Sequence, residues 1–519
     1  MNGARAVLET LTGGGVDVCF TNPGTSEMHF VAALDEVPQM RGVLCLFEGG
    51  ATGAADGYAR MADRPAATLL HLGPGLGNGL ANLHNARRAG TPVVNIVGDH
   101  ATHHKVFDAP LESDIEAAAG TVSRWVRRCV SVRDAGQDTA NTIAAAGSTA
   151  QATGGVATLI LPADVCWSRG ACAAPVTPGQ TTAVDENVLE EAARLLNREG
   201  KHTVVLIGGD LMRRPGLEAA SRIAAATGAR ILAENTPARQ ERGAGIPLVE
   251  RLAYLGEKAT AQLTGVRHLV LAGARSPVSF FAYPNKPSNL VPTGCAVLDL
   301  GGVPMALEEL AHLVAPGVRP VTISAQRPGL PNGALTAQKA AAVIGALMPE
   351  AAIVSDEAVT SGWWLPQATV GCPPHDWLTL TGGAIGQGIP LATGAAIACP
   401  NRPVISLQAD GSAMYTLQAL WTQARESLNV TTVIFSNASY AILGMELGRV
   451  GTRPSTDGRA RALLGLPGLD FVSLAEGLGV PASRAITADD LAKQLSRALT
   501  EPGPCLIEAV VPSQSSFLD

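Results

Sequence analysis

Residues 404–440 read VISLQADGSAMYTLQALWTQARESLNVTTVIFSNASY, a strand, a helix and a second strand in succession. The first apolar run ends at Asp410-Gly411-Ser412, and the second ends at Asn437. A helix that connects two parallel strands brings both strand ends to one edge of the sheet, where α/β proteins form their sites. The segment therefore predicts a parallel α/β sheet with Asp410 and Asn437 close together at that edge.

These two side chains suit a cation that carries a phosphate group. A carboxylate and an amide oxygen are ligands that Mg²⁺ prefers, and the N-terminus of the following helix favours a diphosphate. Taken singly, Asp410-Gly411 is more often an ordinary turn and Asn437 a helix cap. The spacing of 27 residues between Asp410 and Asn437, on paired strand ends, favours the magnesium diphosphate site.

The same alternation of apolar runs and helical segments extends along the whole chain. Strands are expected at 16–21, 42–47, 67–72, 93–97, 204–207, 231–233, 268–272, 296–300, 352–355, 404–408, 430–435 and 505–511. Helices are expected at 49–62 and 79–89, among others. Breaks rich in proline and small residues at 173–185 and 325–333 indicate linkers. The pattern predicts three doubly wound, parallel-sheet α/β domains, at 1–172, 186–325 and 334–519.

Composition excludes several other classes of protein. The 519 residues include 38 Lys and Arg against 45 Asp and Glu, a net charge of −7 without a basic run, which argues against nucleic acid and membrane partners. Nine scattered cysteines without a CxxC pair, and an N-terminus unlike a signal peptide, favour a cytoplasmic location. Residues 382–400 are long and uncharged, but their glycines and prolines favour a loop and a packed helix over a membrane span.

The arrangement of Asp-Gly-Ser and Asn-Ala-Ser-Tyr resembles the fingerprint of the thiamine-diphosphate-dependent decarboxylases and carboligases, such as acetolactate synthase and benzoylformate decarboxylase. The family usually has glycine where Ala409 stands. The resemblance implies that Asp410, Asn437 and the Ser439 carbonyl bind Mg²⁺. It further implies cofactor contacts from a second group, namely Gly411, Ser412, Tyr440, Ala441 and Ile442.

The family also has a glutamate at the end of a strand of the N-terminal domain. Here Glu48 follows the apolar run 44–47 and precedes GGATGAADGYARMA, which is the family pattern. The resemblance implies that Glu48 exchanges a proton with the pyrimidine nitrogen of the cofactor. An isolated glutamate would equally be an acid at a helix N-terminus. Two family motifs 362 residues apart favour the catalytic interpretation.

Further segments fall in register with the family. The loop after the first strand implies cofactor contacts from Pro23, Gly24 and Thr25. His71 corresponds to an active-site histidine of benzoylformate decarboxylase and Asn78 to an amide beside the cofactor. A later loop implies cofactor contacts from Gly383, Ala384 and Ile385, with Ile385 wedged between the two cofactor rings. His71 as a buried structural histidine and Ile385 as plain core are the alternatives.

The substrate pocket is less well defined by the sequence. The candidates are Thr25, His71, His103 and Leu443. The histidines at 100–104 are out of register with those of pyruvate decarboxylases, which favours a solvated or interface loop. Residues 276–285 (SPVSFFAYPN) lack the middle-domain histidine of benzoylformate decarboxylase, and their aromatic residues suggest an apolar wall or linker packing.

The resemblance implies decarboxylation of a 2-oxo acid with transfer to a second carbonyl acceptor, as in acetolactate synthase. The alternative is a benzoylformate-decarboxylase-like enzyme for a larger or aromatic 2-oxo acid, because the segment after Tyr440 lacks the tryptophan of acetolactate synthases. A silent partner subunit is a third possibility, although none of the key residues is lost. The middle domain, compact at 204–210, gives no assurance of FAD. The family further implies domains of six strands and a homodimer or homotetramer whose sites are shared between chains.

Overall fold

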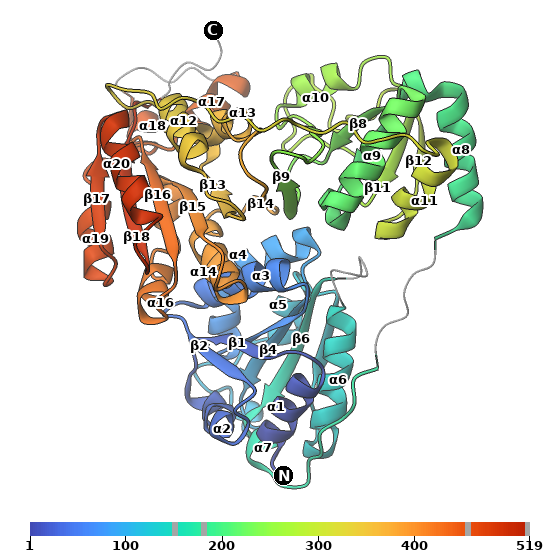
Figure 1. Ribbon diagram of the computed structural model, residues 1–519. Coiled ribbons are helices and arrows are strands. Elements are labelled where there is room, and N and C mark those ends of the chain that lie inside the picture. The colour runs from blue at the N-terminus through green and yellow to red at the C-terminus, as the bar shows by residue number, and fades with distance from the viewer. Residues whose placement is uncertain (148–153, 178–183, 452–457, 514–519) are drawn as a thin grey trace.

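The computed structural model describes residues 1–147, 154–177, 184–451 and 458–513, and it contains three sheets covered by helices (Figure 1). The N-terminal sheet is parallel, with the strand order β2-β1-β3-β4-β6-β5. Its strands are β1 (Val18–Thr21), β2 (Arg41–Leu44), β3 (Ala66–Leu70), β4 (Val93–Asp99), β5 (Trp125–Arg128) and β6 (Val156–Pro162). Its helices are α1 (Gly3–Gly13), α2 (Met28–Ala33), α3 (Glu48–Ala62), α4 (Leu72–Ala89), α5 (Ile115–Gly120), α6 (Ala135–Ala146) and α7 (Ala163–Trp167).

The middle sheet is parallel and has the strand order β10-β8-β7-β11-β12. Its strands are β7 (Thr203–Ile207), β8 (Arg230–Ala233), β10 (Glu250–Arg251), β11 (His268–Ala272) and β12 (Ala296–Asp299). Its helices are α8 (Glu186–Glu199), α9 (Arg214–Thr227), α10 (Gly256–Gln262) and α11 (Pro304–Val314).

The C-terminal sheet has the order β17-β18-β16-β15-β13-β14-β9 and is parallel except for β9. Its strands are β9 (Arg239–Arg242), β13 (Ile353–Glu357), β14 (His375–Thr379), β15 (Val404–Ala409), β16 (Val430–Ser436), β17 (Ala482–Ala485) and β18 (Cys505–Val510). Its helices are α12 (Ala337–Leu347), α13 (Leu365–Ala368), α14 (Gly388–Ala398), α15 (Asp410–Ala413), α16 (Ala419–Arg425), α17 (Ala441–Arg449), α18 (Arg459–Ala462), α19 (Phe471–Gly477) and α20 (Ala488–Ala498).

The predicted class of three parallel-sheet α/β domains is confirmed, but the expectation of six strands in each holds only for the first sheet. Strand β9 lies within the predicted middle domain and yet pairs with β14 of the C-terminal sheet. Side-chain contacts explain why β9 joins the C-terminal sheet. Arg239 forms an ion pair with Asp376 at 2.6 Å, and the Arg242 guanidinium lies 5.0 Å from the centroid of the Trp377 ring. The domain boundaries themselves remain a prediction, and residues 178–183 of the first linker lie outside the described residues.

Helix α3 of the N-terminal domain packs against α14 of the C-terminal domain (Figure 1). The approach requires small residues, because a Cβ atom at Gly57 would overlap the Leu391 backbone and one at Gly394 would overlap the Ala54 carbonyl. The two helices bring the start of α3, at Glu48, close to the loop that precedes α14. Residues 382–400 form the expected loop and helix. Across the described ranges, no helix is both long enough and apolar enough to cross a membrane.

Candidate active site

Glu48 is the first residue of α3, and residues 45–47 connect it to the end of β2. Its side chain is buried, and Asn78 Nδ2 in α4 donates a hydrogen bond to Oε2 at 3.0 Å. Gly75 leaves room for the carboxyl group, since a Cβ atom there would lie 3.2 Å from Oε1. The structure therefore brings together Glu48, for which the resemblance implies contact with the cofactor pyrimidine, and Asn78, for which it implies an amide beside the cofactor.

His71 has a partner that sequence reasoning did not select, Glu27. Glu27 is 1% exposed, and its Oε2 lies 2.8 Å from His71 Nδ1 and accepts from the Gly24 amide at 2.8 Å. An ionised carboxylate only accepts, so this bond uses the hydrogen on Nδ1 and leaves Nε2 available to a second partner. The pair can therefore store and return a proton at Nε2. The sequence signal that could have identified Glu27 is its position three residues after Gly24, in the loop that follows the first strand.

Asp410 follows β15 at the carboxyl edge of the C-terminal sheet and is 2% exposed. Its Oδ2 accepts from the amides of Asn437 at 3.0 Å and Ala438 at 2.7 Å, and its Oδ1 accepts from Gly411 at 2.8 Å. Burial raises the pKa of Asp410, and these amide donors oppose that rise. The strand ends thus meet, as the spacing of the two motifs predicts.

The oxygen atoms of this edge fit a magnesium ion. Asp410 Oδ1 accepts only one of these amide bonds, which leaves a lone pair for a metal. The Asn437 side-chain oxygen is turned into the same loop, where it accepts from the Ser439 amide at 2.9 Å. One carboxylate with neutral oxygens is a donor set that Mg²⁺ accepts when phosphate oxygens and water complete the octahedron.

Glu357 anchors the loop that contains Gly383, Ala384 and Ile385. It ends β13, it is 2% exposed, and its carboxyl group accepts from the amides of Gly386 at 2.7 Å and Gly388 at 2.7 Å. A longer bond of 3.3 Å comes from the Gln387 amide. Burial raises the pKa of Glu357 to about 7, although these amides favour the charged form.

Two asparagines of α4 hold the same loop from the N-terminal domain. Asn85 Nδ2 donates to the Ala384 carbonyl at 2.8 Å. Asn82 Nδ2 donates to the carbonyls of Gly49 at 2.8 Å and Gly386 at 3.1 Å, so that it connects the start of α3 to the loop. The backbone after Glu48 and the backbone after Ile385 are thereby joined through one amide group.

The candidate site has two halves, one in the N-terminal domain around Glu48 and one in the C-terminal domain around Asp410. Strained backbone lies next to both. Leu72, Val359 and Ala438 have φ angles of +49°, +48° and +55°, a region that residues other than glycine rarely adopt. Leu72 follows His71, Val359 lies two residues beyond Glu357, and Ala438 separates Asn437 from Ser439. Such strain costs about 1–3 kcal/mol per residue and clusters at functional sites.

The remaining predicted residues lie around these groups. The Tyr440 ring covers Gly411, where a Cβ atom would overlap it, and Ser412 is buried. Helix α17 begins with Ala441, Ile442 and Leu443, of which Leu443 is exposed. In the N-terminal domain, Pro23 is partly buried and Thr25 is exposed. His103 is exposed, whereas the nearby His100 and His104 rings contact each other at 5.4 Å.

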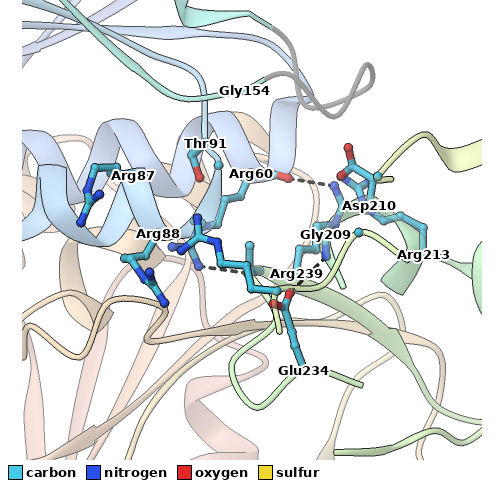
Figure 2. A pocket seen from close by; sticks show the side chains of 16 residues that line it. Arg60, Arg87, Arg88, Thr91, Gly154, Gly209, Asp210, Arg213, Glu234 and Arg239 are labelled. Carbon is cyan, nitrogen blue, oxygen red and sulfur yellow. Dashed lines mark hydrogen bonds and ion pairs between the residues drawn. The ribbon is translucent and has the colours of Figure 1, made fainter. Parts of the chain in front are cut away.

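A separate cavity of about 280 Å³ lies between the N-terminal and middle domains (Figure 2). Arginine side chains from α3, α4 and β9 surround it, together with the carboxyl groups of Asp210 and Glu234. Glu234 Oε1 accepts from the Gly209 amide at 3.1 Å, at the glycine turn that a dinucleotide diphosphate would need. The volume is also below the roughly 300–1,000 Å³ of pockets for drug-sized ligands.

Comparison with known proteins defines the class. Residues 1–118 match the thiamine pyrophosphate enzyme N-terminal binding domain and residues 358–509 match the C-terminal binding domain. The chain belongs to this family of thiamine-diphosphate-dependent enzymes, as the sequence motifs predict.

Within the family, the chain is 62% identical to a putative acetolactate synthase large subunit, IlvX, of Mycobacterium tuberculosis, over 99% of both chains. It is 28% identical to benzoylformate decarboxylase of Pseudomonas aeruginosa, over 98% of both chains. A 4-hydroxybenzoylformate decarboxylase of Rhodococcus jostii has the same fold, with a TM-score of 0.86 and 23% identity over 99% of this chain and 100% of that one.

Proposed function

We propose that this enzyme decarboxylates a 2-oxo acid and joins the remaining fragment to a second carbonyl compound, in the manner of acetolactate synthase. The observation that carries the proposal is the buried Glu48 carboxyl group, held in one orientation by Asn78. A fixed, buried glutamate suits proton exchange with a heterocyclic nitrogen. The 62% identical relative, a putative acetolactate synthase large subunit, supports carboligation.

Thiamine diphosphate, when bound, supplies the carbon nucleophile and the electron sink that decarboxylation requires. Glu48 would exchange the proton on the pyrimidine nitrogen, while Asn78 keeps the carboxyl group in place. Asp410, Asn437 and the Ser439 carbonyl would hold Mg²⁺ against the diphosphate. The residues of the N-terminal domain would thus exchange protons with the cofactor, and those of the C-terminal domain would bind its diphosphate.

We also propose that the site is completed by a second copy of the chain, in a homodimer or homotetramer. Large apolar side chains are exposed next to site residues in the sequence: Met28 directly after Glu27, Leu46 two residues before Glu48, and Met414 and Tyr415 after Ser412. Apolar side chains gathered beside a site are typical of surfaces that another molecule covers. The nine unpaired cysteines support a cytoplasmic location.

A second candidate function is simple decarboxylation, in which the product is protonated and released as an aldehyde. The Glu27–His71 pair favours it, because a histidine whose Nδ1 is held by a buried carboxylate can take up a proton at Nε2 and then pass it to the product. Carboligation instead requires that this proton be withheld until the second carbonyl compound arrives. The two candidates therefore differ in their products.

The test uses the protein loaded with thiamine diphosphate and Mg²⁺ and offered pyruvate, 2-oxobutyrate or benzoylformate. Release of carbon dioxide with a 2-hydroxy-3-oxo acid supports carboligation, and release with an aldehyde supports the second candidate. The matched control is Glu48→Gln, which should bind the cofactor but release carbon dioxide far more slowly. A loaded protein that decarboxylates none of these 2-oxo acids, nor longer ones, would refute both candidates.

A further inference from the structure

Helix α17 directly follows the loop 437–440, and none of its nine residues is buried. Its N-terminal end is fixed through the Tyr440 amide, which donates to the Leu464 carbonyl at 2.8 Å. The helix also contacts the turn Val359–Trp364 of the same domain. Since most of the stability of a helix in a protein comes from the burial of an apolar face, the far end of α17 depends on polar contacts.

These polar contacts join the far end of α17 to the middle domain. Tyr283 Oη donates to Glu446 Oε2 at 2.7 Å, and the Arg449 guanidinium lies 4.3 Å from the centroid of the Tyr283 ring. Arg449 also forms an ion pair at 3.1 Å with Glu257 of α10, the neighbour of α17 across the domain boundary (Figure 1). Lys286 pairs with the same carboxyl group. Together these residues form the clasp.

The charged groups of α17 depend on the middle domain because they do not satisfy each other. Arg449 Nε lies 3.7 Å from Glu446 Oε2, which is too long for a hydrogen bond. The Arg449 side chain is only 6% exposed, and Tyr283 is 9% exposed. Burial and the bond to Glu446 raise the pKa of Tyr283, so that its hydroxyl group keeps its proton and donates at neutral pH. A bond from such a donor to a carboxylate is stronger than one between neutral groups.

The other end of α17 lies at the candidate cofactor site. The Tyr440 ring, directly before the helix, covers Gly411. Ala441 and Ile442 form the start of the helix and are the cofactor contacts that the family resemblance implies. A short helix moves as a rigid element, so a displacement at Arg449 is transmitted to this first turn. The clasp and the cofactor site are thus the two ends of one helix.

We propose that Tyr283, Glu446 and Arg449 are positioning residues, through which the middle domain holds α17 in the place that retention of thiamine diphosphate requires. The proposal rests on the proposed function, since it concerns the same cofactor site. It gives the middle domain a part in cofactor retention, although the proposed ligands of Mg²⁺ all come from the C-terminal domain. The clasp acts on the cofactor only through α17.

Tyr283→Phe tests the clasp, because it removes one hydroxyl group and leaves the ring beside Arg449. We expect thiamine diphosphate to dissociate from the loaded variant in Mg²⁺ about tenfold faster or more, as loss of a hydrogen bond to a charged group predicts. Hydrogen exchange of residues 441–449 should accelerate in the cofactor-free variant. Tyr254→Phe is the matched control: its ring lies 5.3 Å from Phe280 of the same segment, and no described residue accepts a bond from its hydroxyl group.

Substitutions of the acceptor test whether the two residues act through one bond. Glu446→Gln keeps an oxygen that can accept from Tyr283 and should retain the cofactor better than Glu446→Ala does. The double variant Tyr283→Phe with Glu446→Ala should lose the cofactor no faster than Glu446→Ala alone, because both changes remove the same contact. Equal losses from Glu446→Gln and Glu446→Ala, or additive losses in the double variant, would overturn the proposal.

The outcomes separate this proposal from the proposed function. Cofactor retention in Tyr283→Phe equal to that of the parent would overturn the positioning role, even if exchange in α17 were faster. An equal effect of Tyr254→Phe would also overturn it, since loss of any tyrosine hydroxyl group would then suffice. A parent that retains the cofactor but decarboxylates no 2-oxo acid would contradict the proposed function, whereas faster dissociation from Tyr283→Phe would still support the clasp.

Discussion

Replacement of Glu357 by glutamine tests how the loop around Ile385 is held. In the parent, the buried carboxyl group accepts bonds from the amides of Gly386, Gln387 and Gly388. Glutamine is nearly isosteric but has one oxygen and one NH₂ group, so that at least one of these amides faces a donor. An unsatisfied buried donor costs about 1–3 kcal/mol. The variant also removes the ionisation of this site.

The pH dependence follows from the raised pKa of Glu357, about 7 against an ordinary 4.5. Between these values the folded protein binds more protons than the unfolded chain, so this group's contribution to stability is complete below pH 4.5 and is lost as the pH rises through 7. The difference corresponds to about 3 kcal/mol in full, and to about 2 kcal/mol between pH 5 and pH 8. Glutamine does not titrate and contributes equally at both values.

We therefore expect Glu357→Gln to be destabilised relative to the parent by about 2 kcal/mol more at pH 5 than at pH 8. Urea unfolding of both proteins at the two pH values measures this quantity, because other titrating groups cancel in the difference. Glu350→Gln is the control, since Glu350 is exposed in the same domain and should change stability by less than about 0.5 kcal/mol. A parent–variant difference that is constant from pH 5 to pH 8 would refute the reasoning.

The other predictions concern the two halves of the site and their connection. Glu48→Gln should retain cofactor binding and lose about 100- to 10,000-fold in turnover, and deuterium exchange at the thiazolium carbon of the bound cofactor should slow accordingly; unchanged exchange would exclude Glu48 from proton transfer. Asp410→Ala should lose magnesium-dependent retention of the cofactor on dialysis, a result that equal retention would contradict. Subunit exchange between these two inactive variants should restore part of the activity; no recovery after proven exchange would indicate a site within one chain. Arg60→Met, which leaves Asp56 buried without its cation, should destabilise the protein by about 3–5 kcal/mol in urea unfolding, whereas the exposed pair of Arg64 is worth at most about 1 kcal/mol.

Much of the fold and of the site framework was predictable because it depends on short stretches of chain. Strand β15 and the turn at Asp410 are read from an apolar run followed by Asp-Gly-Ser, and the parallel neighbour β16 ends at the motif that begins with Asn437. The start of α3 at Glu48 is likewise visible from an apolar run and the small-residue helix after it. Strands such as β14 and β17 were missed, because their short and partly polar sequences lack the apolar run that marks a buried strand.

The partners of these residues were not predictable, because each contact joins elements far apart in the chain. Glu27 meets His71 across 44 residues, and Glu357 meets the loop at Gly386 across 29. Strand β9 pairs with the C-terminal sheet although it lies within the predicted middle domain. The ion pair and the ring contact that hold it there cannot be read from its own sequence, RQER.

By itself the sequence indicated three α/β domains with mainly parallel sheets and the strand ends that carry Glu48, Asp410 and Asn437, since hydrophobic periodicity and turn residues act locally. The resemblance of its motifs indicated the family. Only the tertiary structure decided which carboxyl group contacts His71 and which one holds the loop of Ile385. These choices depend on how sheets and helices pack against one another, and close packing is a property of side chains brought together from distant parts of the chain.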